Sequence, residues 1–90
     1  MTPNKEFAEP VYPCQFQIKV IGENSGNLEK IIDKVMSSFG EVIRPDEMAI
    51  KRSKNEKYLS MTFEIVAKSR EYVEQIYSEL NAQKEVKMVL

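Results

Sequence analysis

The segment from Gly22 to Leu28 combines the residue types best suited to holding a small ligand. It contains two glycines and several small polar or acidic residues, and it directly precedes an apolar repeat that predicts a helix. The unpaired N–H groups and the positive dipole end of a helix N-terminus favour an anion such as a carboxylate. A plain turn, in which the glycines serve only the backbone, is the alternative. The candidate binding residues for a small anionic metabolite or amino acid are Gly22, Glu23, Asn24, Ser25, Gly26 and Asn27.

The sequence has few residues suited to catalysis or metal binding. The sequence has no histidine and a single cysteine, Cys14, which removes Ser-His and Cys-His nucleophile pairs, imidazole acid-base catalysis and nearly all zinc sites. Cys14 alternates with Phe16 and Ile18, so we expect a buried, unreactive thiol. A soft-metal carrier would instead need a Cys-x-x-Cys pair. The prediction is a protein that is not an enzyme, with no metal and no cofactor.

The size and charge of the chain narrow its class further. Its 90 residues, of which 42% are hydrophobic and 30% charged, fit one small globular domain. A net charge of -1 argues against nucleic acid or an anionic membrane as a partner held by bulk electrostatics. The single cysteine, together with the absence of a signal-peptide pattern and of a run of about 20 apolar residues, predicts a cytoplasmic location.

The first half of the sequence predicts a lead-in, a strand and a helix. Three of the four prolines fall within residues 1–13, so we expect an extended or disordered lead-in over 1–12 and a single domain over 13–90. Apolar and polar residues alternate from Cys14, as in a half-buried strand, and the alternation stops at Gly22. Ser25 is the expected N-cap of a helix that Gly40 ends. The apolar positions of this helix are Leu28, Ile31, Ile32, Val35, Met36 and Phe39.

The second half predicts a hairpin, a helix and a last strand. A connector over 41–46 contains Pro45, a strand follows at 47–53, and the polar residues 54–57 form a turn before a clearly alternating strand from Tyr58. Ser69 is the expected N-cap of the second helix, and residues 85–90 form the last strand. The expected inward side chains are Met48, Ile50, Leu59, Met61, Phe63, Ile65, Val73, Ile76, Tyr77, Leu80, Val86, Met88 and Leu90.

This order of elements predicts the ferredoxin-like class of α+β folds. The expected plan is βαββαβ, a four-stranded antiparallel sheet with both helices on one face and the strand order 4-1-3-2. The other face of the sheet is then open, with Gln17 and Lys19 from the first strand and Ser60, Thr62 and Glu64 from the third. None of these side chains is aromatic, so RNA binding by base stacking is disfavoured.

Several segments, in this order and spacing, carry a family resemblance. They include Tyr12-Pro13-Cys14, Lys19-Val20-Ile21-Gly22, Tyr58-Leu59-Ser60-Met61-Thr62 and Val86-Lys87-Met88-Val89-Leu90. Over about residues 12–90 the sequence resembles the YbeD family of small bacterial proteins. The resemblance implies an ACT-like, ferredoxin-like fold and carries over no catalytic residue. ACT-type regulatory domains bind amino acids at the loop after the first strand, often beside a Gly-x-Leu such as Gly26-Asn27-Leu28.

Two functional hypotheses follow. The first is a non-enzymatic, ACT-like regulatory module that binds a small effector, an anionic metabolite or amino acid, at Gly22–Asn27. The second is a protein-interaction adaptor that acts on a protein partner, or forms a homodimer, through the open sheet face or an edge strand. The expected partner face consists of residues in the family segments quoted above whose side chains point away from the helices, so that packing does not explain them. The alternative is that this face is only solvated. These positions are Lys19, Tyr58, Ser60 and Thr62.

Overall fold

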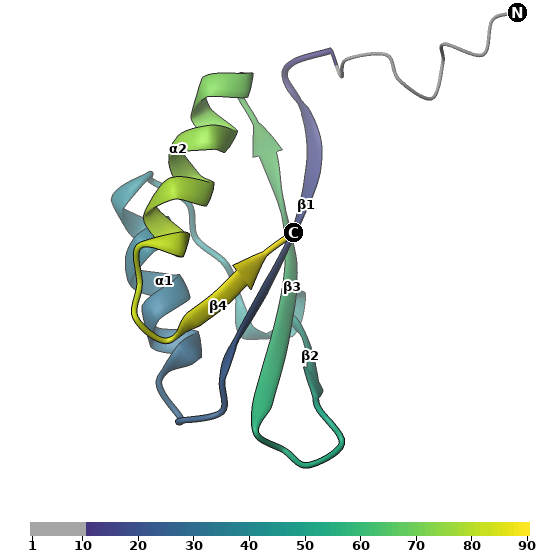
Figure 1. Cartoon of the computed structure of the whole chain (residues 1–90). Coiled ribbons are helices and arrows are strands. Elements are labelled where there is room, and N and C mark those ends of the chain that lie inside the picture. Colours follow the sequence, from purple (N-terminus) through teal and green to yellow (C-terminus); the bar gives the residue numbers. More distant parts are fainter. Residues whose placement is uncertain (1–10) are drawn as a thin grey trace, which may run out of the picture.

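The computed structural model describes residues 11–90, whose elements follow the predicted order βαββαβ with one added turn of 3-10 helix. The expected lead-in over 1–12 lies outside the described residues except for Val11 and Tyr12. Figure 1 shows both helices on the same side of the sheet. The elements are β1 (Cys14–Glu23), α1 (Leu28–Ser38), η2 (Pro45–Glu47), β2 (Ala49–Arg52), β3 (Tyr58–Ala67), α2 (Arg70–Asn81) and β4 (Val86–Val89).

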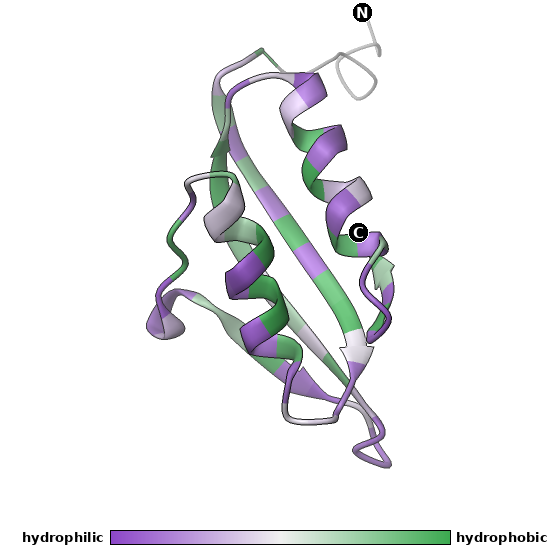
Figure 2. Ribbon diagram, turned by 90° about the vertical axis from the view of Figure 1, so that its left-hand side faces the viewer, coloured by the Kyte–Doolittle hydropathy of each residue, from purple (hydrophilic) through white to green (hydrophobic). Residues whose placement is uncertain are grey.

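β1 and β3 form the centre of the sheet. Their antiparallel pairing runs along both strands, from Cys14 opposite Ala67 to Glu23 opposite Tyr58. β2 pairs with β3 and β4 pairs with β1, which gives a four-stranded antiparallel sheet of order β2-β3-β1-β4. Figure 2 shows the two helices in front of one face of this sheet. The ferredoxin-like plan and its strand order are therefore confirmed.

The core lies between the helices and the sheet, as the two-residue repeat of the strands and the 3.6-residue repeat of the helices require. Every second residue of β1 and β3 points to the helices, and the apolar stripe of each helix points back. Among the described residues, no polar or charged residue is buried. Each large apolar side chain that is fully buried stabilises the fold by about 1.5–3 kcal/mol. The largest fully buried side chains are Phe63, Ile18, Leu28, Ile32, Met36, Ile76, Leu80 and Val20.

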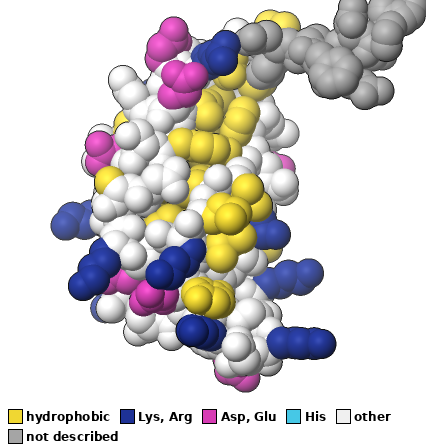
Figure 3. Space-filling view, in the orientation of Figure 1, with side chains coloured by type: hydrophobic (Ala, Val, Ile, Leu, Met, Phe, Trp, Pro, Cys, Tyr) yellow, Lys and Arg dark blue, Asp and Glu magenta, His cyan; other side chains and the backbone are white. Residues whose placement is uncertain are grey.

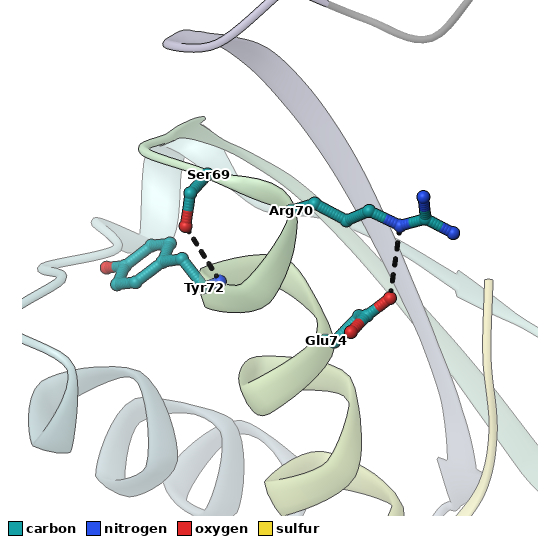
Figure 4. Close-up of polar contacts among 4 residues, drawn as sticks. All are labelled: Ser69, Arg70, Tyr72 and Glu74. Carbon is teal, nitrogen blue, oxygen red and sulfur yellow. Dashed lines mark hydrogen bonds and ion pairs between the residues drawn. The ribbon is translucent and has the colours of Figure 1, made fainter.

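The two helices begin differently. For α1 the prediction of Ser25 as N-cap is wrong, because Asn27 takes that position and its side chain makes no capping hydrogen bond. The helix begins where Leu28 is buried, and Ser25 lies in the exposed turn before it. For α2 the prediction is confirmed: the Ser69 hydroxyl accepts a hydrogen bond of 3.1 Å from the backbone N–H of Tyr72 (Figure 4). Gly40 ends α1 as expected, with a φ of 79° that favours glycine.

Arg70 and Glu74 lie one turn apart on the outer side of α2. The Arg70 Nε and the Glu74 carboxylate are 3.2 Å apart, as Figure 4 shows. Both side chains are more than half exposed, at 61% and 64%, so this i,i+4 pair adds little to the stability of the fold. The start of α2 therefore depends mainly on the Ser69 cap and on its buried apolar stripe.

β2 is shorter and more exposed than expected. It covers Ala49–Arg52, and all of its residues are exposed. Ile50 lies opposite the buried Met61, so it faces the helix side of the sheet, yet it is 45% exposed and its prediction as a core residue is wrong. The physical reason is its place at the edge of the sheet, beyond the cover of the helices. Met48, just before the strand, is partly buried against the core.

β4 departs from the predicted alternation. The register between β1 and β4 shifts at Ile21/Gly22, so that Val89 lies opposite Val20 and Met88 opposite Ile21. The shift is a β-bulge, which turns the residues beyond it to the other face of the sheet. Val86 is buried as predicted, but Met88 and Leu90 are 49% and 55% exposed. Their prediction as inward side chains is wrong, and Val89 takes the inward position instead.

Cys14 is also less buried than expected. It is the first residue of β1, at one end of the sheet, and its side chain is half-buried. Ala67, directly opposite, is fully buried. The thiol alternates with Phe16 and Ile18 as predicted, but at the end of the sheet the core covers it incompletely.

Candidate functional site

Hydrogen bonds hold the start of the Gly22–Asn27 loop against its neighbours. The Glu23 N–H donates to the carbonyl of Glu85 at 3.0 Å, and the Asn24 N–H donates to the carbonyl of Lys57 at 3.0 Å. The Asn24 side-chain amide donates to the carbonyl of Glu56 at 2.8 Å. Asn24 therefore ties the loop to the turn between β2 and β3, which is a structural role for one predicted binding residue.

Gly22 has a packing role as well. It is buried, and a Cβ added to it would lie 2.7 Å from the Glu85 carbonyl oxygen and 2.7 Å from a methyl group of Leu28. Both distances are shorter than atoms tolerate without a shift of the backbone or of the Leu28 side chain. Glycine at this position is explained by the close approach of β1, β4 and the first turn of α1.

The rest of the loop presents the N-terminus of α1 to solvent. Ser25, Gly26 and Asn27 are exposed, and Gly26 has a φ of 87°. A hollow of about 410 Å³ beside Gly26 is also lined by Glu29, Lys30, Asp33, Ile43, Pro45 and Met48. Two carboxylates and one ammonium group at this hollow give no net attraction for an anion. The geometry keeps the N-terminus accessible and supplies little positive charge around it.

The open sheet face consists of the side chains that point away from the helices, and cross-strand rows organise it. One row runs from Lys51 through Ser60 and Ile21 to Met88. The next row runs from Ala49 through Thr62 and Lys19 to Leu90, where Lys19 and Leu90 exchange two backbone hydrogen bonds of 3.0 and 2.8 Å. We call this part the four-stranded half. The two-stranded half is β1 and β3 alone, over 14–18 and 63–67.

The structure brings three of the four predicted partner-face residues together. Lys19, Tyr58 and Ser60 line one hollow of about 240 Å³ in the four-stranded half. Thr62 lies in the adjacent row and lines a different hollow, at the start of β2. The other lining residues of the first hollow are Ile21, Lys51, Arg52, Ser53 and Leu59.

The charge of the four-stranded half is mainly positive. Among residues 11–90, neither Lys19 nor Lys51 forms an ion pair. The Lys57 ammonium lies 5.7 Å from the centre of the Tyr58 ring, and Glu23 is neutralised by Lys87 at 3.2 Å. This half therefore combines free ammonium groups with the hydroxyl groups of a tyrosine and a serine.

Exposed apolar side chains lie beside these ammonium groups. Met88 and Leu90 occupy the β4 ends of the two rows and are about half exposed. Figure 3 shows hydrophobic side chains in a column through the middle of this view, with Lys and Arg side chains around its lower part. The sequence reasoning placed both residues in the core, because the bulge that turns them outward depends on the register with β1. No local signal in the sequence marks it.

A further hollow connects the two predicted sites. It has a volume of about 420 Å³, and Tyr58 and Lys57 line it together with Glu23, Asn24 and Ser25 of the loop and with Glu56. The loop and the open face, which were separate hypotheses from the sequence, therefore meet at Tyr58. A ligand in this hollow would contact residues of both.

Tyr72 makes a polar contact that the sequence analysis did not anticipate. Its hydroxyl donates to the carboxylate of Glu41 and lies 3.3 Å from the carbonyl oxygen of Phe39. The ammonium group of Lys68 lies 5.0 Å from the centre of the Tyr72 ring. Burial, and then the hydrogen bond and negative charge of Glu41, raise the pKa of Tyr72 to about 12. Burial also raises the pKa of Tyr77, so both hydroxyls are neutral at physiological pH.

Residues 11–90 contain neither a metal-binding cluster nor a membrane-spanning helix. These residues include no group of three or more His, Cys, Asp or Glu side chains placed to hold a metal ion. No helix in the same range has the length and apolar character to cross a membrane.

The family relationship of the chain is clear from comparison with known sequences. Residues 9–90 match the family described as "Protein of unknown function (DUF493)". The chain belongs to this family. A UPF0250 protein of Hahella chejuensis is 29% identical over 86 residues, which cover 96% of this chain and 94% of that protein. A UPF0250 protein of Leptothrix cholodnii is 36% identical over 80 residues, which cover 88% and 87%. The resemblance to YbeD-like proteins is thereby confirmed.

Solved structures confirm the fold. Protein HP0495 from H. pylori superposes with a TM-score of 0.76 at 16% identity and covers 100% of this chain and 96% of its own. The ACT domain from the GTP pyrophosphokinase of Chlorobium tepidum has a TM-score of 0.67 at 18% identity, with coverages of 86% and 95%. At these identities the likeness concerns the ACT-like fold alone.

Proposed function

We propose that the protein is a non-enzymatic, cytoplasmic interaction module that binds a protein partner through the four-stranded half of its open sheet face. The observation that carries the proposal is the arrangement of Lys19, Tyr58 and Ser60 around one hollow, with Met88 and Leu90 exposed beside it. Exposed apolar side chains next to polar and charged groups are typical of protein-binding surfaces. The regulatory loop hypothesis is weaker, because packing and turn formation explain Gly22 and Asn24.

Partner capture by variants of this face tests the proposal. The immobilised protein is exposed to an extract of cells that express it, as wild type, as Lys19→Glu and as Met88→Ser. Lys34→Glu is the matched control, since it makes the same charge change at an exposed position of α1. We expect wild type and control to retain the same amount of the same partner. Each face variant should retain at least about tenfold less of it.

Two results would contradict this proposal. One is equal capture by all four proteins. The other is a loss of capture with Lys34→Glu as well, which would indicate a nonspecific effect of charge. Circular dichroism of each variant checks that the fold is intact, which we expect because neither Lys19 nor Met88 belongs to the buried core.

A second candidate function is supported by the accessible N-terminus of α1. A small anionic metabolite or amino acid would bind at Gly22–Asn27, with the N–H groups after Asn27 as donors and Lys57 beside the hollow at Tyr58. An amide chemical-shift titration with pooled amino acids and nucleotides tests it. Saturable shifts confined to this loop and to Lys57–Tyr58 would support it. Their absence at millimolar ligand would leave the loop as a turn.

A further inference from the structure

A hollow of about 520 Å³ lies along β3 beyond the point where β2 begins. One wall is the connector between α1 and β2, with Glu41, Val42, Ile43 and Glu47, and the other includes β3 from Thr62 to Val66. β2 reaches along β3 only as far as Ala49, which lies opposite Thr62. Within residues 11–90, no strand pairs with β3 on this side over 63–67. The hollow therefore occupies the place that a longer β2 would fill.

The backbone direction of β3 shows which groups point into the hollow. The Ser53 N–H donates to the Tyr58 carbonyl at 2.9 Å, so the polar backbone groups of Tyr58 point to β2. In an antiparallel sheet this direction alternates from residue to residue. The groups of Ser60 and Thr62 thus also point to β2, and those of Glu64 and Val66 point the same way, past its end. Two N–H and two C=O groups in ladder geometry are available to an added strand.

The charge of the hollow indicates what kind of strand it would accept. Its lining includes the carboxylates of Glu41, Glu47 and Glu64 and no Lys or Arg. Glu64 is exposed on the open face, while Glu41 is held by the Tyr72 hydroxyl. Val42, on the connector, is apolar and 80% exposed. A segment with basic residues and apolar residues would complement this surface in charge and in hydrophobicity.

We propose that an extended segment of a partner protein, with basic and apolar residues in alternation, adds to β3 as a strand at Glu64–Val66. The residue opposite Glu64 has its side chain on the open face, and a Lys or Arg there meets the Glu64 carboxylate. Its neighbours in sequence point to the helix side, where an apolar side chain meets the connector. This surface adjoins the one under "Proposed function" at Ala49 and Thr62, but Lys19 and Met88 do not line it.

A titration with synthetic peptides tests the strand addition. The probe is a capped peptide of about eight residues in which Lys and Val alternate, a length typical of strands. We expect saturable amide shifts at Glu64 and Val66 and slower hydrogen exchange of these two N–H groups in the complex. Two control peptides have the same length. One has Glu in place of Lys, and the other has N-methyl groups at alternate residues, which remove the N–H donors on one edge.

Variants of the protein test the role of charge. Glu64→Lys should weaken binding of the Lys/Val peptide about tenfold or more. Glu79→Lys, the same change at an exposed position of α2, should leave it unchanged. Met88→Ser, the uncharged variant of the other surface, should also leave it unchanged. A failure of strand addition and a failure of the proposed function therefore affect different variants. All three positions lie outside the buried core, and circular dichroism checks their folding.

Four results of the peptide titration would overturn the proposal. They are equal binding of the Glu/Val peptide, equal binding of the N-methylated peptide, shifts that exclude Glu64 and Val66, and no saturable binding at millimolar peptide. A fifth concerns the occupant. If the free protein protects the Glu64 and Val66 amides as its own concentration rises, a second copy fills the edge, and the proposed foreign segment is wrong.

Discussion

Gly22 illustrates how one residue can suit two explanations until its surroundings are known. In the sequence it belongs to a glycine-containing loop before a helix, and in the structure it is the point where β1 meets Leu28 and the Glu85 carbonyl. We expect Gly22→Ala to lower the free energy of unfolding by about 1–3 kcal/mol, because the new methyl group overpacks this contact. Urea denaturation measures the change. Gln17→Ala, at an exposed position of the same strand, is the control and should stay within about 0.5 kcal/mol of wild type. A Gly22→Ala variant as stable as this control would contradict the packing explanation.

Tyr72 predicts how stability changes at alkaline pH. Burial and the Glu41 carboxylate raise its pKa in the folded protein to about 12, from the ordinary tyrosine value of about 10. Below pH 10 the hydroxyl is protonated in both states and its contact with Glu41 contributes fully. Between pH 10 and 12 the unfolded chain loses this proton more readily, so stability falls as pH rises. Urea midpoints across this range should show the fall, and Tyr72→Phe should reduce it. Part of the fall in stability should remain in Tyr72→Phe, since the pKa of Tyr77 is raised as well. An unchanged slope in Tyr72→Phe would exclude this role for Tyr72.

At the scale of elements, the two serines predicted as N-caps provide a matched comparison. Ser69 accepts the Tyr72 N–H at 3.1 Å, whereas Ser25 lies two residues before the N-cap position of α1. Ser69→Ala should therefore lower the free energy of unfolding by about 0.5–2 kcal/mol, and Ser25→Ala should leave it nearly unchanged. Chemical denaturation of both variants measures this difference. Equal effects of the two substitutions would mean that Ser69 does not stabilise α2 through its hydroxyl.

The same contrast shows what the sequence could predict about the elements. Periodicity located both helices and the two long strands, because their apolar faces are buried along their length. It failed for the edge strands. Ile50 fits the alternation, but the helices do not cover β2, and Met88 fits it until the bulge at Ile21/Gly22 reverses its face. Both failures arise from tertiary context, since cover by a helix and register with a partner strand are absent from the local sequence.

At the scale of the molecule, the candidate surfaces were predictable only in part. The alternation of side chains along each strand assigned Lys19, Tyr58 and Ser60 to the open face, and the predicted strand order made them neighbours. This part of the surface could therefore be predicted from the sequence. The exposure of Met88 on this face could not be predicted from the sequence, because it depends on the bulge. The hollow beside Glu64 could not be predicted either, since it results from the short length of β2 and from the path of the connector.

The distribution of stability across the sheet gives a last prediction. β1 and β3 pair along their full length and supply most of the core from the sheet, whereas all residues of β2 are exposed. Native-state hydrogen exchange should therefore show the Phe63 amide, which points to β1, exchanging only through global unfolding. The Lys51 amide, which points to β3, should exchange through local opening with a lower free energy and little dependence on denaturant. Equal free energies and equal denaturant slopes for the two amides would show that β2 unfolds with the core. A β2 that opens separately lengthens the free edge of β3 from 63–67 toward Tyr58, so strand addition at Glu64–Val66 would act on the least stable side of the sheet.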